Sequence, residues 1–350
     1  VELGGDRPII TIVLLNVVTA FIFTAMMGAG PVIAIGVIVL PILMSLGIPK
    51  AIAMFTFMGS VSAGMYLNPV LQFSQLRAFI CASDEMPEFS FSWYTSHWGI
   101  YALIISVVVV SVLTGIYLKI GKKSHAWAAQ AAPKNTQTEA PLIALILPIV
   151  PVVLKIWLDF SVIGGVIAGF AALFLCGKMN KSFKENCQLV NKLYYDGVVD
   201  TAPLVGFLLT LPMFNTCASY ASPYFKEVLG GIMPTNEYVV CALFAALSIL
   251  GFFRGPLTLY GCGAATLGVL SSVGHFSVPF LFCVFTIPAT TVNVGSCITQ
   301  SWIAWGLAYT KVESRDYLKL SIPFAYICSI LLYILTAFTV TGLGPEWFLS

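Results

Sequence analysis

FTIPATTVNVGSCITQSW, residues 285–302, lies within a hydrophobic segment, residues 279–309, that is long enough to cross a bilayer. Its centre nevertheless contains proline, glycine and a run of hydroxyl and amide side chains. Backbone that leaves the helix at that depth has to be buried in protein or line a wet cavity, because lipid cannot satisfy its N–H and C=O groups. Broken helices at mid-membrane form the substrate and ion sites of secondary transporters. The stretch therefore predicts a binding site inside the membrane.

The composition of the whole chain supports this setting. Of its 350 residues 59% are hydrophobic and 9% are charged, whereas soluble domains carry about a quarter charged residues. The apolar runs have the length of membrane helices, so we predict an all-α polytopic membrane protein whose main partner is the lipid bilayer. Nothing in the chain indicates binding of nucleic acid. The nine cysteines occur singly, which indicates neither a metal centre nor a disulfide framework.

The apolar segments fall into two halves separated by a hydrophilic linker, residues 121–140, which we expect to be cytoplasmic. The first half, residues 1–120, has apolar runs interrupted by MMGAGP (26–31) and by MGSVSAGMYLNP (58–69), then a polar, acidic loop at 77–97 and an uninterrupted span at 99–118. The second half, residues 141–350, begins with three apolar segments at 141–154, 160–176 and 197–213 and a basic amphipathic stretch at 178–196 that suits a membrane surface. It continues with an interruption at RGPLTLYGCG (254–263), the opening stretch and a last span at 316–341.

Lysine and arginine are enriched in cytoplasmic loops of membrane proteins. The lysines of the linker, those of 178–192 and the basic residues at 311–319 all fall on one side if each Gly-Pro interruption is the tip of a re-entrant hairpin. If each unit instead crosses the membrane twice, the loops fall on the same sides, so that alternative stays open. We expect a multi-pass protein of the inner (cytoplasmic) membrane with its C-terminus outside.

The two halves share an order of features, namely a hairpin with a Gly-Pro tip, a broken helix that begins Phe-Thr and an uninterrupted span. Because the hairpins enter from opposite faces, the halves are predicted to be inverted repeats with two re-entrant hairpins and two discontinuous transmembrane helices. The first half has no counterpart of the three apolar segments that precede the second hairpin. We therefore expect about a hundred further residues of scaffold before Val1, by analogy with the other repeat.

This arrangement resembles the ion transporter superfamily, which includes gluconate permeases, citrate and C4-dicarboxylate carriers, sodium/dicarboxylate symporters and the large subunit of TRAP transporters. The likeness rests on TAMMGAGPVIAIGVIVLPILMSLGIP (24–49), on MGSVSAGMYLNP (58–69), and on RGP (254–256) with TVNVGSCITQ (291–300). It implies a proton- or sodium-coupled carrier of small organic anions, in which a transport domain moves against a homodimeric scaffold. Several relatives have Ser-Asn-Thr at the hairpin tips. Because both tips differ here, sodium sites built on that motif do not transfer.

Hairpin tips and helix breaks direct helix N-termini toward one place, where unpaired N–H groups and partial positive charge favour a carboxylate. We expect the four interruptions to meet there and to need no cofactor beyond the coupling ion. The predicted substrate-binding residues are Gly28, Gly30, Ser60, Ser62, Asn68, Arg254, Gly255, Thr258, Thr290, Thr291, Asn293, Gly295, Ser296 and Thr299. Oxygen atoms near Gly59, Ser60, Asn293 and Ser296 form a candidate Na⁺ site. Each Ser or Thr taken alone is equally compatible with a bond to its own helix.

Arg254 is the sharpest single candidate, because it is the only Lys, Arg, Asp or Glu between Glu237 and Lys311. An ionisable side chain at membrane depth is expensive and usually functional, and Arg pairs with carboxylates through two hydrogen bonds. Arg254 could equally bind backbone carbonyls. No Asp or Glu lies deep in an apolar segment, which favours Na⁺ over H⁺ coupling on chemical grounds, whereas some of the relatives are proton symporters.

Two other functions are alternatives to an organic-anion carrier, namely an inorganic-ion exchanger and an intramembrane enzyme. An exchanger of inorganic ions, Na⁺/H⁺ or oxyanion, uses the same fold. An intramembrane enzyme needs a motif such as HExxH or a pair of mid-membrane aspartates, and neither occurs in the sequence. The sequence thus predicts a secondary transporter and not an enzyme.

Overall fold

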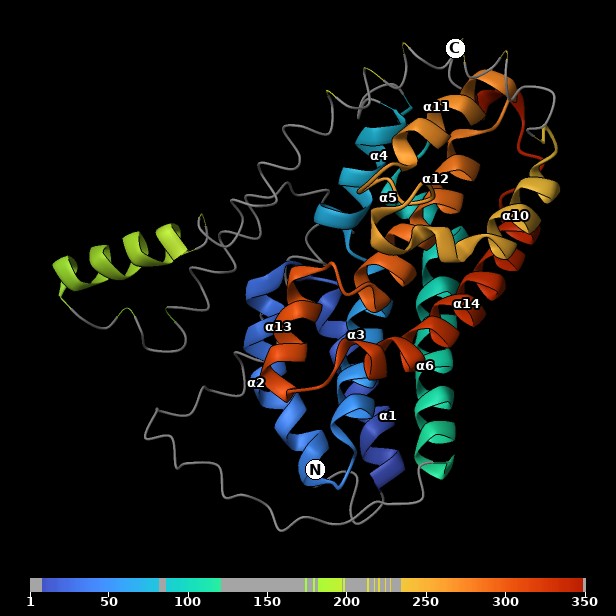
Figure 1. Cartoon of the computed structure of the whole chain (residues 1–350). Helices are drawn as coiled ribbons and strands as arrows, with labels where there is room; N and C mark the ends of the chain where they lie inside the picture. The colour runs from blue at the N-terminus through green and yellow to red at the C-terminus, as the bar shows by residue number, and fades with distance from the viewer. Residues whose placement is uncertain are drawn as a thin grey trace.

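The computed structural model describes residues 8–81, 86–120, 182–196 and 234–348, together with single positions between 174 and 227 (Figure 1). The ordered elements in these ranges are helices, without a strand. Two of them, Phe91–Ile120 and Ser314–Thr339, are long and apolar enough to cross a membrane, and a bent pair at Glu237–Arg254 makes a third if counted as one span. The predicted all-helical class is thereby confirmed, and these helices indicate a membrane protein. The expected linker and the segment 141–154 lie outside the described residues, as do most of 160–176 and most of 197–213.

The elements follow the chain in two groups. The first contains α1 (Pro8–Phe23), α2 (Ala29–Ser45), α3 (Lys50–Met65), η1 (Pro69–Phe73), α4 (Ser74–Ile80), α5 (Phe91–Tyr94), η2 (Thr95–Gly99) and α6 (Ile100–Ile120). The second contains α10 (Glu237–Ala246), η5 (Ser248–Arg254), α11 (Gly263–Val273), α12 (Val278–Ile287), η6 (Pro288–Val294), α13 (Ser301–Thr310), α14 (Ser314–Thr339) and η7 (Pro345–Trp347). Four connections between these helices correspond to the interruptions predicted from the sequence. We name residues 24–28 the first tip, 66–68 the first break, 255–262 the second tip and 295–300 the second break.

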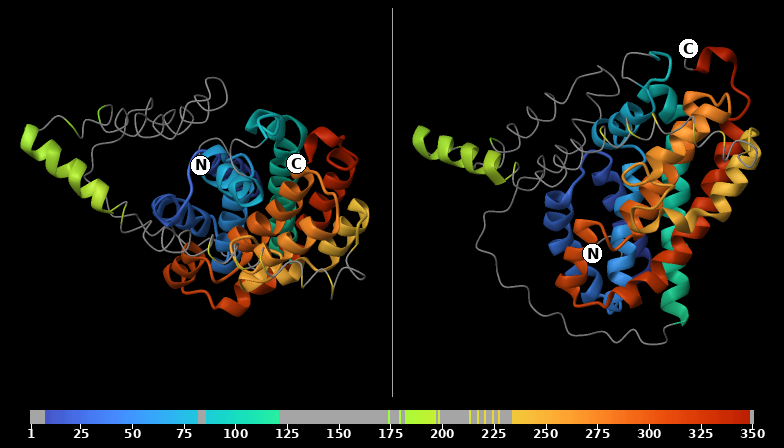
Figure 2. Two further views of the ribbon diagram at one scale, coloured as in Figure 1. Left: turned by 90° about the horizontal axis from the view of Figure 1, so that it is seen from above. Right: turned by 45° about the horizontal axis from the view of Figure 1, so that its top comes forward.

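Helix α3 and the continuous segment α12–η6 form the centre of the molecule. Every residue of α3 from Ile52 to Met65 is buried, and so is every residue of α12 and η6. A helix buried on all sides needs no polar face, which agrees with the apolar run before each break. The surrounding helices pack on this pair, with α1, α2, α6, α13 and α14 all in contact with α3 (Figure 2).

Helices α6 and α14 run antiparallel. Their cross-links show this, because Trp98 Nε1 donates to Thr336 Oγ1 at 3.0 Å whereas Tyr117, near the other end of α6, donates to Leu320 O at 3.1 Å. The C-terminal end of α6 therefore lies beside the N-terminal end of α14. Both ends carry basic residues, which agrees with the expected common side for positive charge.

Each π-helix of the centre begins with a proline, Pro69 in η1 and Pro288 in η6. Proline has no N–H to donate to the carbonyl four residues earlier, so the regular helix cannot continue unchanged, and the turn widens. Pro288 removes the helical donor of Val284 O, and the Tyr333 hydroxyl donates to that oxygen at 3.2 Å instead.

The structure corrects two boundaries expected from the sequence. The interruption MGSVSAGMYLNP stays helical through Met65, and only residues 66–68 leave the helix. Packing explains this difference, because the small residues Gly59 and Gly64 let Val110 and the Ala20 carbonyl approach α3 closely. The loop expected at 77–97 is partly helical, since α4 extends to Ile80 and Ser90 caps α5 by accepting from the Trp93 N–H at 3.2 Å.

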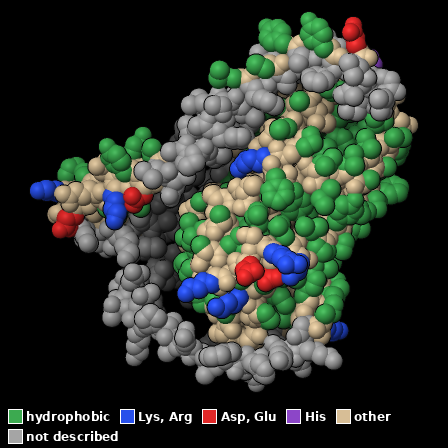
Figure 3. Space-filling model, in the orientation of Figure 1, with side chains coloured by type: hydrophobic (Ala, Val, Ile, Leu, Met, Phe, Trp, Pro, Cys, Tyr) green, Lys and Arg blue, Asp and Glu red, His purple; other side chains and the backbone are tan. Residues whose placement is uncertain are grey.

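Hydrophobic side chains cover much of the outer surface seen in Figure 3. On α6 the exposed positions Ile104, Val108 and Val112 follow one another at intervals of four residues, and α1 also exposes a row of apolar side chains. Such a surface is unfavourable in water and favourable against lipid. Charged side chains gather where α13 leads into α14, at residues 311–319.

Candidate functional site

Asn68 connects the first break to the first tip. Its Nδ2 donates to Phe23 O at 3.4 Å and to Met26 O at 3.3 Å, and its Oδ1 accepts from the Gln72 N–H at 3.4 Å. The tip itself turns at Gly28, whose φ of 109° is unfavourable for any residue with a Cβ. Gly30 lies in the first turn of α2. The polar side chain of the break thus satisfies carbonyls that the end of α1 leaves free.

Gln72 connects the first group of helices to the second. Its Nε2 donates to Thr290 Oγ1 at 2.6 Å, and its Oε1 accepts from the Tyr260 hydroxyl at 3.2 Å. Thr290 lies in η6 and Tyr260 lies in the second tip. All three side chains are buried, so one amide holds η1, η6 and the second tip together.

Tyr66 forms a second bridge from the first break to η6. Its hydroxyl lies 2.5 Å from Thr291 Oγ1, and its carbonyl accepts from the Tyr94 hydroxyl at 3.0 Å. The Thr291 hydroxyl also lies within 3.8 Å of Cys328 Sγ. These contacts anchor the first break on both sides.

The second break has its freed carbonyls satisfied by side chains. Trp302 Nε1 donates to Val294 O at 3.1 Å, the Tyr317 hydroxyl donates to Gly295 O at 2.6 Å, and Ser321 Oγ donates to Ser296 O at 3.3 Å. Ser296 Oγ itself donates to Thr291 O at 3.0 Å. Buried carbonyls need such donors, because water is excluded from this interior.

Ser60 and Ser62 lie on the regular part of α3 and bond to their own helix. Ser60 Oγ donates to Thr56 O at 2.8 Å, and Ser62 Oγ donates to Gly59 O at 2.9 Å. Ser62 is nevertheless in contact with the second break, because a Cβ added to Gly295 would lie 2.5 Å from Ser62 Oγ. Helix α3 and the second break therefore touch at this pair.

Asn293 and Thr258 are fully buried and differ from the residues above. Neither Oδ1 nor Nδ2 of Asn293 has a hydrogen-bonding partner among the described residues, and the same holds for Thr258 Oγ1. Asn293 lies in the π-helix η6, and π turns are frequent at functional sites. Buried polar groups without partners are rare and costly in native proteins.

The second tip is entered through a strained backbone. Phe253 and Arg254 are consecutive residues with φ of 55° and 58°, in the left-handed region that non-glycine residues seldom occupy. The Phe253 N–H donates to Cys297 Sγ at 3.1 Å, and Arg254 Nη1 donates to Tyr260 O at 3.0 Å. Gly255 follows, with no room for a Cβ because Leu250 O would lie 2.0 Å away. Arg254 thus lies partly exposed at the edge of the tip.

The predicted residues are brought together in part. Asn68, Thr290, Thr291 and the Ser62–Gly295 pair belong to one connected region at the centre. Thr299 is exposed and pairs with Cys297 Sγ at 3.0 Å, so it faces away from that region. Tyr66, Gln72 and Tyr260 are not among the residues predicted from the sequence, although a glutamine in an apolar segment is a signal for a buried polar contact.

The candidate Na⁺ site consists of neutral oxygen atoms. Ser60 Oγ and Ser296 Oγ each donate a hydrogen bond and retain lone pairs, and Asn293 Oδ1 has no donor among the described residues. Such oxygens suit a hard cation. Within the part of the chain that the structure describes, no group of three His, Cys, Asp or Glu side chains could hold a metal ion.

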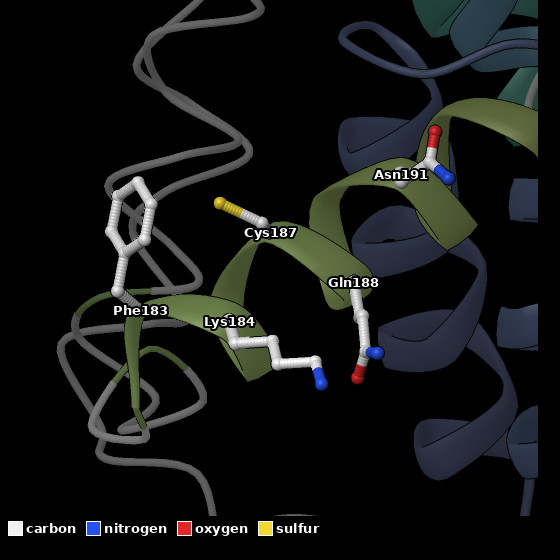
Figure 4. Close-up of a pocket in the computed structure, with 5 residues that line it drawn as sticks. All are labelled: Phe183, Lys184, Cys187, Gln188 and Asn191. Carbon is white, nitrogen blue, oxygen red and sulfur yellow. The ribbon is translucent and has the colours of Figure 1, made fainter.

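A separate open pocket lies on the helix at 183–196. Its described lining comes from one face of this helix, namely Phe183, Lys184, Cys187, Gln188 and Asn191 (Figure 4). The helix is exposed along most of its length. The pocket does not involve the breaks or the tips and is not part of the candidate site.

Comparisons with protein-family models, with curated proteins and with solved structures gave no match to this chain. The resemblance to the ion transporter superfamily therefore rests on the sequence pattern alone, and the function has to be argued from the site.

Proposed function

We propose that this protein is a secondary active transporter of small organic anions such as carboxylates, coupled to Na⁺ or H⁺. The observation that carries the proposal is the connection of the first tip, the first break, the π-helix η6 and the second tip through Asn68 and Gln72. Asn68 joins the first break to the first tip, and Gln72 joins the adjoining π-helix to η6 and the second tip. Interrupted helices held together at one place are how transporters of this kind build a binding site.

The order of elements supports a repeat. In each group two helical arms flank a tip, a buried helix then breaks next to a proline-initiated π-helix, and a long helix follows. Together with the antiparallel directions of α6 and α14, this order favours inverted repeats and re-entrant hairpins. Alternating access then follows as motion of the tips and broken helices against the rest of the protein.

Charge supports an anion as the substrate. Arg254 stands at the second tip, and α3, α12, η5 and η6 carry no Asp or Glu. A buried anion without a countercharge is strongly unfavourable, whereas a guanidinium offers paired donors to a carboxylate. The left-handed backbone at Arg254 is a further mark of a functional position.

Uptake of labelled gluconate, citrate, succinate and lactate by proteoliposomes tests the proposal. Vesicles with an inward Na⁺ gradient, with an inward proton gradient and with neither are compared. We expect concentrative uptake of an organic anion under one of the gradients. Exchange of cations without uptake of any organic anion would instead establish an inorganic-ion exchanger.

Substitution of Arg254 tests the anion site itself. We expect Arg254→Ala to weaken binding of the transported anion at least ~30-fold, the equivalent of about 2 kcal/mol for a lost hydrogen bond to a charged group. Binding to the purified protein is measured by calorimetry, and thermal unfolding reports on the fold. Arg315→Ala, an exposed arginine at the start of α14, is the matched control and should bind as the wild type does. Equal binding by Arg254→Ala would remove this residue from the site.

A further inference from the structure

The buried polar side chains predicted for the site differ in how far the protein satisfies them. Ser60, Ser62 and Asn68 in the first half all bond to backbone carbonyls of their own half. In the second half, Asn293 and Thr258 are equally buried and find no partner among the described residues, and the hydroxyl groups of Ser248, Thr286 and Ser329 also lack one. A hydroxyl group can turn toward a carbonyl of its own helix, whereas Asn293 has a donor end and an acceptor end that are both unsatisfied. Since leaving such groups unsatisfied destabilises the folded protein, Asn293 indicates that a ligand supplies the missing bonds.

The chemistry of Asn293 restricts that ligand. A carboxamide has one acceptor oxygen and two donor hydrogens, and both ends of this one lack a partner. A plain carboxylate only accepts, so it would satisfy Nδ2 and leave Oδ1 without a donor. The coupling Na⁺ of the candidate cation site can also satisfy Oδ1; without a cation there, a ligand that satisfies the whole side chain has to bring a donor as well as an acceptor.

The donor is best supplied by a neutral hydroxyl group. An ammonium group would need a negative partner, and the elements that pack on η6 carry no Asp or Glu apart from Asp316, which is exposed at the start of α14 and paired with Lys319. A hydroxyl group both donates and accepts without adding charge. It therefore matches a carboxamide in an interior without anions.

The segment that carries Arg254 and Thr258 lies against the segment that carries Asn293. A Cβ added to Gly251 would lie 3.1 Å from Pro288 Cβ and 3.3 Å from Val292 Cγ1. Farther along, the Phe253 N–H donates to Cys297 Sγ. Cationic, hydroxyl and carboxamide groups are thus contributed by two packed segments, and a ligand reaches the buried ones when the second tip moves away from η6.

We propose that the site takes a hydroxylated carboxylate, held by the second half of the protein. Arg254 and Thr258 bind the carboxylate, and Asn293 binds the hydroxyl group through both its amide N–H and its oxygen. The inference rests on the proposed function and adds the chemical class of the substrate. It also assigns ligand contacts to the second half and a supporting role to Ser60, Ser62 and Asn68.

Pairs of anions that differ by one hydroxyl group test the inference, with malate against succinate and lactate against propionate. A site with buried polar groups rejects an analogue that leaves them unpaired, so we expect the hydroxylated member of a bound pair to bind at least ~10-fold more tightly. Affinities are measured by calorimetry on the purified full chain.

Three variants identify the residues responsible. Asn293→Leu should reduce the preference for the hydroxylated anion to within ~2-fold, because no carboxamide is then left unpaired. Thr258→Val should weaken both members of a pair equally and keep their ratio. Thr310→Val on α13 removes a buried hydroxyl group that already has a partner, Gly306 O at 2.7 Å, and should change neither affinity nor ratio. If Asn293→Leu does not fold, Asn293→Ala, which also carries no polar side-chain atom, serves in its place, with thermal unfolding as the check on folding.

The outcomes separate this inference from the proposed function. If the wild type binds no organic anion, the proposed function fails. If it binds both members of each pair equally, the hydroxyl inference is overturned and the carrier function stands. If Asn293→Leu keeps the ratio but raises the Na⁺ concentration needed for binding, Asn293 serves the coupling cation, and the inference is again overturned.

Discussion

Gly295 marks the closest approach between α3 and the second break. Its φ of −92° is open to any residue, so backbone conformation does not require a glycine here. The lack of space does require a glycine, because a Cβ would lie 2.5 Å from Ser62 Oγ and 2.7 Å from Ser62 Cβ. The serine is short and buried and cannot move aside as a long side chain would. Contact between α3 and the second break at this point therefore depends on the absence of one methyl group.

Gly295→Ala should lower the free energy of unfolding by about 1–3 kcal/mol, the usual range for forcing an extra carbon into a packed interior. Unfolding in mixed detergent micelles measures the change. Ser62→Gly makes room, because the next atom, Met58 O, lies 3.7 Å away. The double variant should therefore lose less stability than the two single changes add up to. Strict additivity would show that the pair is not in contact.

Gly115→Ala is the matched control for this experiment. Gly115 also lies in a helix, but nothing lies within 4 Å of an added Cβ. Alanine restricts the unfolded chain more than glycine and favours the helix, so the control should gain roughly 0.5–1 kcal/mol.

The buried polar residues show what the sequence could predict at this scale. Thr290, Thr291 and Asn293 were predicted as a group because they crowd into one apolar segment. Gln72 and Tyr66 were missed because each stands alone, and their partners Thr290 and Thr291 lie 218 and 225 positions away. Local periodicity carries no information about pairs so distant in the chain. The hydrogen bonds of Tyr66 and Gln72 become apparent only when the first break and η1 are packed against η6.

At the scale of elements, the two prolines that begin η1 and η6 determine where the central helices change. Pro288 leaves Val284 O without its regular helical donor, and Tyr333 on α14 replaces it. The aromatic hydroxyl thus holds α12 to α14 at the point where the helix widens.

Tyr333→Phe should destabilise the protein by about 1–3 kcal/mol, because it leaves a buried carbonyl without a donor. Restoring the backbone donor with Pro288→Ala should recover part of that loss in the double variant. The free energy of unfolding of the wild type, both single variants and the double variant completes the cycle. A Tyr333→Phe variant as stable as the wild type would show that the carbonyl has another donor.

Element boundaries were predictable where an apolar run gives way to a Gly-Pro or Gly-rich stretch. Gly-Pro and Gly-rich stretches separated α1 from α2 and η5 from α11 as expected. The continuation of α3 through Ser60, Ser62 and Met65 was not predictable, since serines and glycines weaken an isolated helix. Packing on all sides outweighs that preference, and close contacts of Gly59 and Gly64 turn small residues into an advantage.

At the scale of the molecule, the antiparallel pair α6 and α14 sets a direction across the membrane. The end with Lys119 and Arg315 carries the lysines and arginines of these two helices, and the described residues at the other end, next to Ser96 and Thr339, carry His97 but neither Lys nor Arg. From the positive-inside tendency we predict that the first end faces the cytoplasm.

Cysteine labelling checks this orientation in whole cells. In a background without the native cysteines, Ser96→Cys should react with a membrane-impermeant maleimide added outside, and Ser314→Cys should react only after the cells are opened. Both positions are exposed, so burial does not limit the reaction. Labelling of both from the same side would contradict the orientation and the repeat that depends on it.

The donors that satisfy the second break have a mechanical consequence. Trp302 on α13, with Tyr317 and Ser321 on α14, holds three consecutive carbonyls. Turning η6 against these helices would break hydrogen bonds in an interior where they are strong. The segment η5, which leads into the second tip, contacts that region. The Phe253 N–H donates to Cys297 Sγ, and Gly251 packs against η6. If the second tip moves during transport, we therefore expect it to move against a second break that stays fixed to α13 and α14.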